Sequence, residues 1–148
     1  MTKSEKAVNL FKQGYNCCQA VFCAFCEDFG INLETGLKLS SSFGGGMGGM
    51  REVCGTVSGM FMVLGLKYGY SVSNDMNLKK QHYNLIQQAA RKFAEENGSI
   101  ICKELLGISK PNRDAEYVPA ERNAEFFKKR PCVELVAFAA SLTEKLLN

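Results

Sequence analysis

Apolar residues recur along this 148-residue chain mostly at helical spacing, whereas the alternation typical of strands is scarce. Glycine, asparagine and serine punctuate the helical stretches and mark where they start and stop. The helices that this pattern predicts cover about 7–14, 16–30, 33–42, 53–68, 75–98, 99–107 and 131–146. We therefore expect an all-α fold, a single-domain bundle of about five to seven helices formed by residues 1–148.

A glycine-rich loop precedes the fourth of these helices. Five glycines in the six residues 44–49 are incompatible with a regular helix. The helix that follows starts near Glu52 or Val53 and is apolar along its length, with small residues on one side. Because small residues allow close approach of another backbone, we expect this helix to be central.

Two further patterns mark where helices start and end. Asn16 is a predicted N-cap, with Gln19 as its capping-box partner. Residues 108–121 hold two of the three prolines and no apolar period, so they are expected to form a long connection. Pro131 then suits the first turn of the terminal helix.

Composition and charge exclude several classes of protein. A hydrophobic content of 46% is enough to bury a core. The net charge is only +3, and the basic run 128–130 is short, so we expect no nucleic-acid partner. Residues 53–66 are too short for the ~20 residues of a membrane span, and the charged residues 1–6 resemble no secretory leader. These features predict a cytoplasmic location.

Seven cysteines are many for a cytoplasmic chain, where thiols are kept reduced, and they point to metal binding or redox chemistry. Four of them fall in the first turn of a predicted helix, where unpaired N–H groups favour a thiolate. These four are Cys17, Cys54, Cys102 and Cys132. Alternating helix directions allow their helix starts to meet at one end of the bundle.

Converging thiolates repel one another, and helix dipoles contribute only ~0.3–1 kcal/mol per site. A bound cation or iron–sulfur cluster, one or two disulfides, or retained protons must therefore remove charge. The glycine loop beside Cys54 adds a second element, because successive N–H groups form a nest for an anion or for cluster sulfides. Its candidate cofactor-binding residues are Gly44, Gly45, Gly46 and Gly48.

The remaining cysteines and the single histidine indicate other roles. Cys18 faces the aromatic stripe of its helix and is expected in the core. Cys23 and Cys26 have C-x-x-C spacing but lie in mid-helix, which favours core filling or partly exposed thiols over a redox pair. A Cys–His dyad would have to use His82.

Several ordered motifs together carry a family resemblance. They are GYNCCQAV at 14–21, FGGGMG at 43–48, CGTVSG at 54–59, LGLKYG at 64–69, CKELLG at 102–107 and the late Cys132. The chain thereby resembles the redox-active family named for its C, G-C-A-x-x-G, C, C cysteine pattern. That resemblance implies four characteristic cysteines at the positions of Cys17, Cys54, Cys102 and Cys132, and a redox role. Thr56 departs from the alanine of the motif and adds a hydroxyl beside the site.

Three hypotheses follow. In the first, Cys17, Cys54, Cys102 and Cys132 bind an iron–sulfur cluster or another thiolate-bound metal for electron transfer, as an oxidoreductase or electron carrier with a redox partner. In the second, two of the four cycle between dithiol and disulfide, with Cys17 or Cys54 as the attacking, catalytic thiol. In the third, the chain is a non-enzymatic binding domain or homodimer with buried structural cysteines, which predicts that the four sulfurs lie far apart.

Overall fold

The computed structural model describes residues 1–108 and 116–148, and within them it is all-α, with eight α-helices, two 3₁₀ turns and no strand. The predicted fold class is therefore confirmed. The α-helices are α1 (Lys3–Lys12), α2 (Cys17–Cys23), α3 (Leu33–Ser40), α4 (Gly55–Tyr68), α5 (Met76–Asn97), α6 (Cys102–Leu106), α7 (Ala124–Lys129) and α8 (Cys132–Leu147). The 3₁₀ turns are η1 (Cys26–Phe29) and η2 (Ser41–Phe43).

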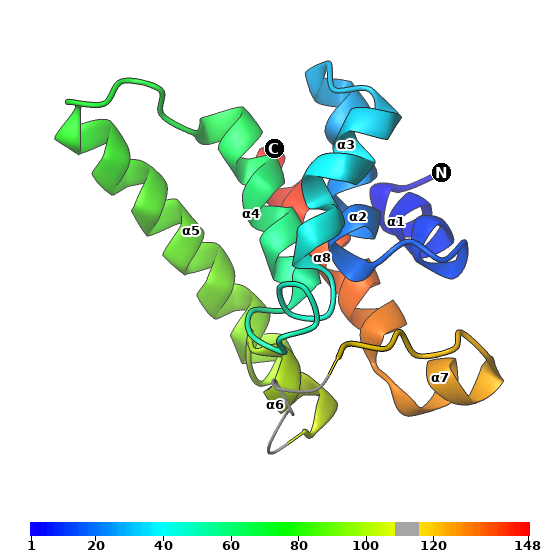
Figure 1. Cartoon of the computed structure of the whole chain (residues 1–148). Coiled ribbons are helices and arrows are strands. Elements are labelled where there is room, and N and C mark those ends of the chain that lie inside the picture. The colour runs from blue at the N-terminus through cyan, green and yellow to red at the C-terminus, as the bar shows by residue number, and fades with distance from the viewer. Residues whose placement is uncertain (109–115) are drawn as a thin grey trace.

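The core lies between α1, α2, α4 and α8, and α4 runs through its middle (Figure 1). Helix α4 is apolar on every side and buries eight of its fourteen residues. A β-carbon on Gly59 would lie only 3.0 Å from the carbonyl oxygen of Cys18, so glycine is what lets α2 pack this closely. The expectation of a central helix with a slim face is confirmed.

Helix α5 is the longest element and lies along the outside of the bundle (Figure 1). Asp75 caps it by accepting a hydrogen bond from the amide of Leu78. Only Ala89 and Phe93 are buried, and the Phe93 ring packs edge-on against Phe138 of α8 at 5.7 Å. No helix of the described residues is long and apolar enough to cross a membrane.

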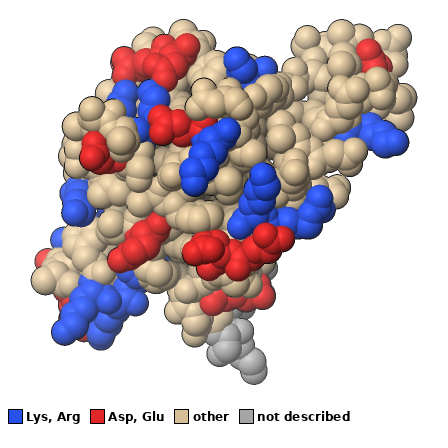
Figure 2. Space-filling view, turned by 180° about the vertical axis from the view of Figure 1, so that it is seen from behind, with Lys and Arg blue, Asp and Glu red and all other residues tan. Residues whose placement is uncertain are grey.

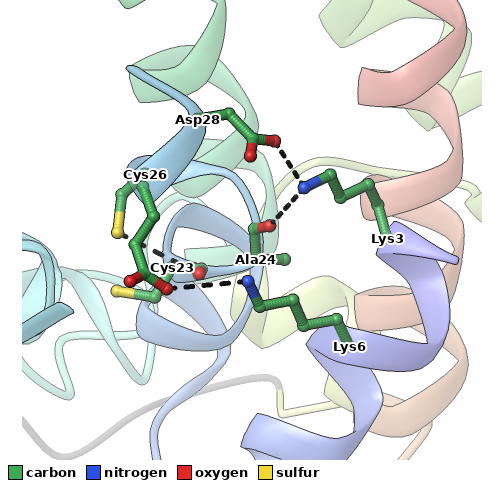
Figure 3. Close-up of polar contacts among 7 residues, drawn as sticks. Lys3, Lys6, Cys23, Ala24, Cys26 and Asp28 are labelled. Atoms are coloured by element: carbon green, nitrogen blue, oxygen red, sulfur yellow. Dashed lines mark hydrogen bonds and ion pairs between the residues drawn. The ribbon is translucent and has the colours of Figure 1, made fainter. Parts of the chain in front are cut away.

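The second helix is shorter than its apolar pattern suggests. It begins at Cys17 with the predicted capping box of Asn16 and Gln19, but it ends at Cys23 rather than near Gly30. Lys3 of α1 donates to the carbonyl of Ala24 at 3.1 Å and pairs with Asp28 (Figure 3). The Ala24 carbonyl, which would accept the next hydrogen bond of a longer α2, thus binds Lys3 of α1, and the chain turns into η1.

Other elements differ from the prediction as well; α1, for example, covers Lys3–Lys12 and not 7–14. Helix α4 begins at Gly55, and not at Glu52 or Val53, because Val53 forms an isolated antiparallel bridge with Ile101. Helix α7 was not predicted; Asn123 caps it through the amide of Phe126. The predicted connection 108–121 holds no helix in its described part, and residues 109–115 lie outside the described residues.

Candidate functional site

A cavity of about 470 Å³ lies where the starts of α2, α4, α6 and α8 meet. Cys17, Cys54, Cys102 and Cys132 all line it, and we call it the cysteine cavity. The structure thus brings together the four cysteines that the sequence singled out. A domain with scattered structural cysteines would have placed them far apart, and this arrangement does not match that expectation.

The starts of α4 and α6 are fixed to each other by backbone hydrogen bonds. The Cys54 amide donates to the carbonyl of Ile100 at 2.8 Å, and the Cys102 amide donates to the carbonyl of Glu52 at 2.6 Å. Cys54 is the N-cap of α4 rather than a first-turn residue, whereas Cys17, Cys102 and Cys132 are the first residues of their helices. A short two-stranded contact therefore sets the spacing of two of the four thiols.

The glycine-rich loop winds through consecutive left-handed residues from 45 to 49, with φ between 60° and 81°. Left-handed conformations are unfavourable for residues with a β-carbon, which explains why glycine dominates this segment. Gly44, Gly45 and Gly48 line the cysteine cavity. Gly46 does not; a β-carbon on it would lie 2.7 Å from the Cβ of Cys102, so it packs behind the site.

Cys17 is the thiol of this site best suited to ionise. A hydrogen bond from the Cys54 thiol lowers the pKa of Cys17 to about 6, and the amides of Gly45, Cys17 and Cys18 assist by donating to its sulfur. Burial acts in the opposite direction but is outweighed. At neutral pH the side chain is therefore mainly a thiolate held by donors from the glycine loop and the start of α2.

Cys54 is the protonated partner of this pair. Its hydrogen bond to Cys17 and its burial raise its pKa well above the ordinary value. The hydroxyl of Thr56 lies 3.1 Å from the Cys54 sulfur, is fully buried and acts in the opposite direction, favouring the thiolate. The hydroxyl that distinguishes this chain from the alanine of the family motif therefore contacts a site sulfur directly.

Replacing Thr56 with valine keeps the side-chain shape but removes the donor to Cys54. We expect any reaction that needs the Cys54 thiolate to slow about two- to threefold. The lost hydrogen bond of about 1 kcal/mol lowers the thiolate population about fivefold, but the more basic thiolate is a stronger nucleophile. Stopped-flow resolution of a Cys17 mixed disulfide measures this step, and Thr56→Ser, which keeps the hydroxyl, is the control. An unchanged rate in Thr56→Val would show that the hydroxyl has no such role.

Cys102 and Cys132 complete the site in protonated form. Burial and the negative charge of Cys17 raise the pKa of both thiols, that of Cys132 to about 11. Arg51 opposes this at Cys102, with its Nη1 atom 3.7 Å from the sulfur. Three thiols thus keep their protons around one thiolate, which is one of the three ways of removing charge that the sequence left open.

Three arginines also line the cysteine cavity, and none of them was selected from the sequence. Besides Arg51 they are Arg122, just before α7, and Arg130, at its end. Arg122 donates to the carbonyls of Phe11 at 2.7 Å and Tyr15 at 3.1 Å. The only available signal was the pair of phenylalanines in α7, on one of which both Arg122 and Arg130 stack.

The other cysteines lie outside the cavity. Cys18 is fully buried in the core, as predicted. Cys23 and Cys26 are also fully buried, which confirms core filling. Figure 3 shows them in the segment that Lys3 and Lys6 of α1 hold through ion pairs with Asp28 and Glu27 of η1. His82 does not line the cavity, so no described histidine is placed to activate a site thiol.

As placed, the four thiols do not form a ready site for a single ion. Among residues 1–108 and 116–148, no group of three or more cysteine, histidine, aspartate or glutamate side chains is close enough to hold one. Cys17 and Cys54 influence each other's pKa most strongly, while Cys17 acts on the pKa values of Cys102 and Cys132 through its charge. The donor set is all sulfur and suits soft metals, but binding requires Cys102 and Cys132 to approach the pair.

Comparison with known proteins identifies the family. The model of the family described as "Putative redox-active protein (C_GCAxxG_C_C)" matches residues 15–146, nearly the whole chain. No curated protein and no solved structure matches the chain significantly. The matched region includes all four cysteines of the cavity. The chain therefore belongs to this C_GCAxxG_C_C family of redox-active proteins.

Proposed function

We propose that the protein exchanges electrons through a dithiol–disulfide couple formed by Cys17 and Cys54. The observation that carries this proposal is that Cys17 and Cys54 line one cavity, with the Cys17 sulfur against the start of α4, and that each side chain is the largest influence on the pKa of the other. Thiol–disulfide exchange needs an attacking thiolate and a second thiol within reach of the attacking sulfur. The other two cavity cysteines remain protonated and are secondary in this scheme.

The exchange takes place in two steps. The Cys17 thiolate attacks one sulfur of a substrate disulfide, RSSR, and forms a Cys17–SR bond while a thiolate RS⁻ leaves. The leaving thiolate takes up the proton of Cys54. The Cys54 thiolate, aided by Thr56, then attacks the Cys17 sulfur and releases the second RS⁻. Two electrons pass from the protein to RSSR, and a Cys17–Cys54 disulfide remains.

A cysteine-bound iron–sulfur cluster or metal used for electron transfer is the second candidate function. It is favoured by the presence of four cysteines around one cavity, two more than dithiol chemistry requires. In that case Cys17, Cys54, Cys102 and Cys132 would be the ligands, and the amide of Gly45 would donate to the Cys17 sulfur as it does now. The metal would supply one-electron chemistry that the thiols lack.

Anaerobic purification followed by iron, zinc and sulfide analysis and a thiol count in denaturant separates the two candidates. For the dithiol couple we expect colourless protein without bound metal, with seven thiols after reduction and a loss of two upon mild oxidation. A matched Cys102→Ser/Cys132→Ser variant should lose the same two thiols. Stoichiometric iron and sulfide that depend on all four cysteines would instead support the cluster and overturn the couple.

A further inference from the structure

The charge of the cysteine cavity differs from that of the surface. Figure 2 shows acidic and basic side chains interspersed over one face of the molecule. The cavity, in contrast, is lined by Arg51, Arg122 and Arg130, and none of its described lining residues is acidic. Arginine stays protonated in proteins, so three positive charges face the space in which Cys17 reacts.

Other groups hold these arginines in place and leave donors available. Arg122 stacks on the Phe11 ring at 4.1 Å, and Arg130 stacks on the Phe126 ring at 4.8 Å. Arg51 lies against the Cys102 sulfur at 3.7 Å. A guanidinium carries five N–H donors, more than these contacts use, in a geometry that matches a carboxylate.

The size of the cavity and its apolar wall indicate a small molecule. About 470 Å³ falls in the range of small-molecule sites, roughly 300–1,000 Å³. Leu105, Leu106 and Leu135 supply apolar lining on the α6 and α8 sides. Because the attacking Cys17 lines this cavity, the substrate sulfur has to enter it, which a small molecule does more readily than a disulfide on a folded protein surface.

Resting on the dithiol couple proposed above, we propose that the substrate is a small anionic disulfide. Its carboxylates bind Arg51, Arg122 and Arg130, and its sulfur–sulfur bond lies against Cys17. The substrate is the oxidant: its S–S bond breaks, both sulfurs leave as thiolates or thiols, and the Cys17–Cys54 bond forms. The arginines also stabilise the anionic products as they form.

Three symmetrical disulfides of different charge test this assignment. We would measure the rate of Cys17–Cys54 disulfide formation in the reduced full-length chain with 3,3′-dithiodipropionate, 2-hydroxyethyl disulfide and cystamine, which are anionic, neutral and cationic. Each rate is divided by that of 2-mercaptoethanol with the same disulfide. We expect the anion to be favoured over the cation by at least about tenfold at low salt, and less at high salt.

Arginine variants assign the preference to the cavity. Arg51→Gln and Arg130→Gln should each lower the ratio of the anionic to the neutral disulfide about fivefold, the effect of one charge about 4 Å away even in water. Arg91→Gln, on the exposed face of α5, is the matched control and should leave the ratio unchanged. Arg122 is avoided because it also holds the carbonyls of Phe11 and Tyr15. Melting temperatures verify that the variants are folded.

The outcomes distinguish the two proposals. Equal rates for all three disulfides, with a Cys17–Cys54 bond formed each time, would overturn the anionic substrate and leave the dithiol couple standing. A ratio that stays high in both arginine variants would overturn the assignment to the cavity. If no probe oxidises the Cys17–Cys54 pair, both proposals fail.

Discussion

Cys17→Ser is expected to slow the reaction of the reduced protein with disulfides about 100-fold at pH 7. With the pKa of Cys17 at about 6 and that of Cys132 at about 11, Cys17 carries on the order of 10⁴ times more thiolate. A less basic thiolate is a weaker nucleophile, and this reduces the advantage of Cys17 by a factor of about 10², to about 100-fold. Stopped-flow kinetics with 2-hydroxyethyl disulfide measures the difference.

The matched control is Cys132→Ser, which removes a thiol from the same cavity and should react nearly as fast as the unaltered chain. The pH profile adds a second readout. The alkylation rate of Cys17 should rise as pH increases through about 6 and then level off, because the thiolate is the reacting form. The hydrogen bond from the Cys54 thiol and the amides of Gly45, Cys17 and Cys18 set this low pKa, and burial opposes them. A midpoint near the ordinary thiol value would refute the thiolate assignment.

Gly55→Ala is expected to destabilise the fold by about 1–3 kcal/mol and to disturb Cys17. The added β-carbon would lie 2.5 Å from the Cys17 sulfur and 3.0 Å from both the Cys18 amide nitrogen and the Phe43 carbonyl oxygen. Two of these three neighbours are backbone atoms, which cannot rotate away as a side chain can. Denaturant unfolding gives the free energy, and the alkylation profile of Cys17 reports on the site.

Gly65→Ala is the control within the same helix. A β-carbon there meets nothing within 4 Å, so the substitution should stabilise α4 by up to about 1 kcal/mol through helix propensity alone. Opposite signs for the two variants are the expected result. If Gly55→Ala were as stable as Gly65→Ala with Cys17 unaltered, the close packing of α4 against the start of α2 would be wrong.

The sequence pattern predicted those features that local chemistry determines. The capping box at Asn16 and Gln19 and the burial of Cys18 depend on neighbours a few residues away, and both are confirmed. The placement of Cys17, Cys102 and Cys132 at helix starts depends on similar local signals. Their common cavity was inferred only as a hypothesis about how the helices alternate.

The features that the sequence did not predict depend on contacts between distant segments. Cys54 became an N-cap because Val53 pairs with Ile101, nearly fifty residues away, and no local pattern reveals such a bridge. Arg122 joins the site because its guanidinium donates to one carbonyl in the last turn of α1 and one in the turn that follows. A single arginine in an unpatterned stretch gives no indication of the surface on which it will lie.

Mapping the disulfide that forms upon mild oxidation tests the central claim most directly. The reduced chain would be oxidised with one equivalent of 2-hydroxyethyl disulfide, the remaining thiols alkylated, and the peptides identified by mass spectrometry without reduction. We predict one linkage, between Cys17 and Cys54, with Cys102 and Cys132 recovered as alkylated thiols. A Cys102–Cys132 or Cys23–Cys26 linkage in its place, with Cys17 and Cys54 both alkylated, would contradict the account.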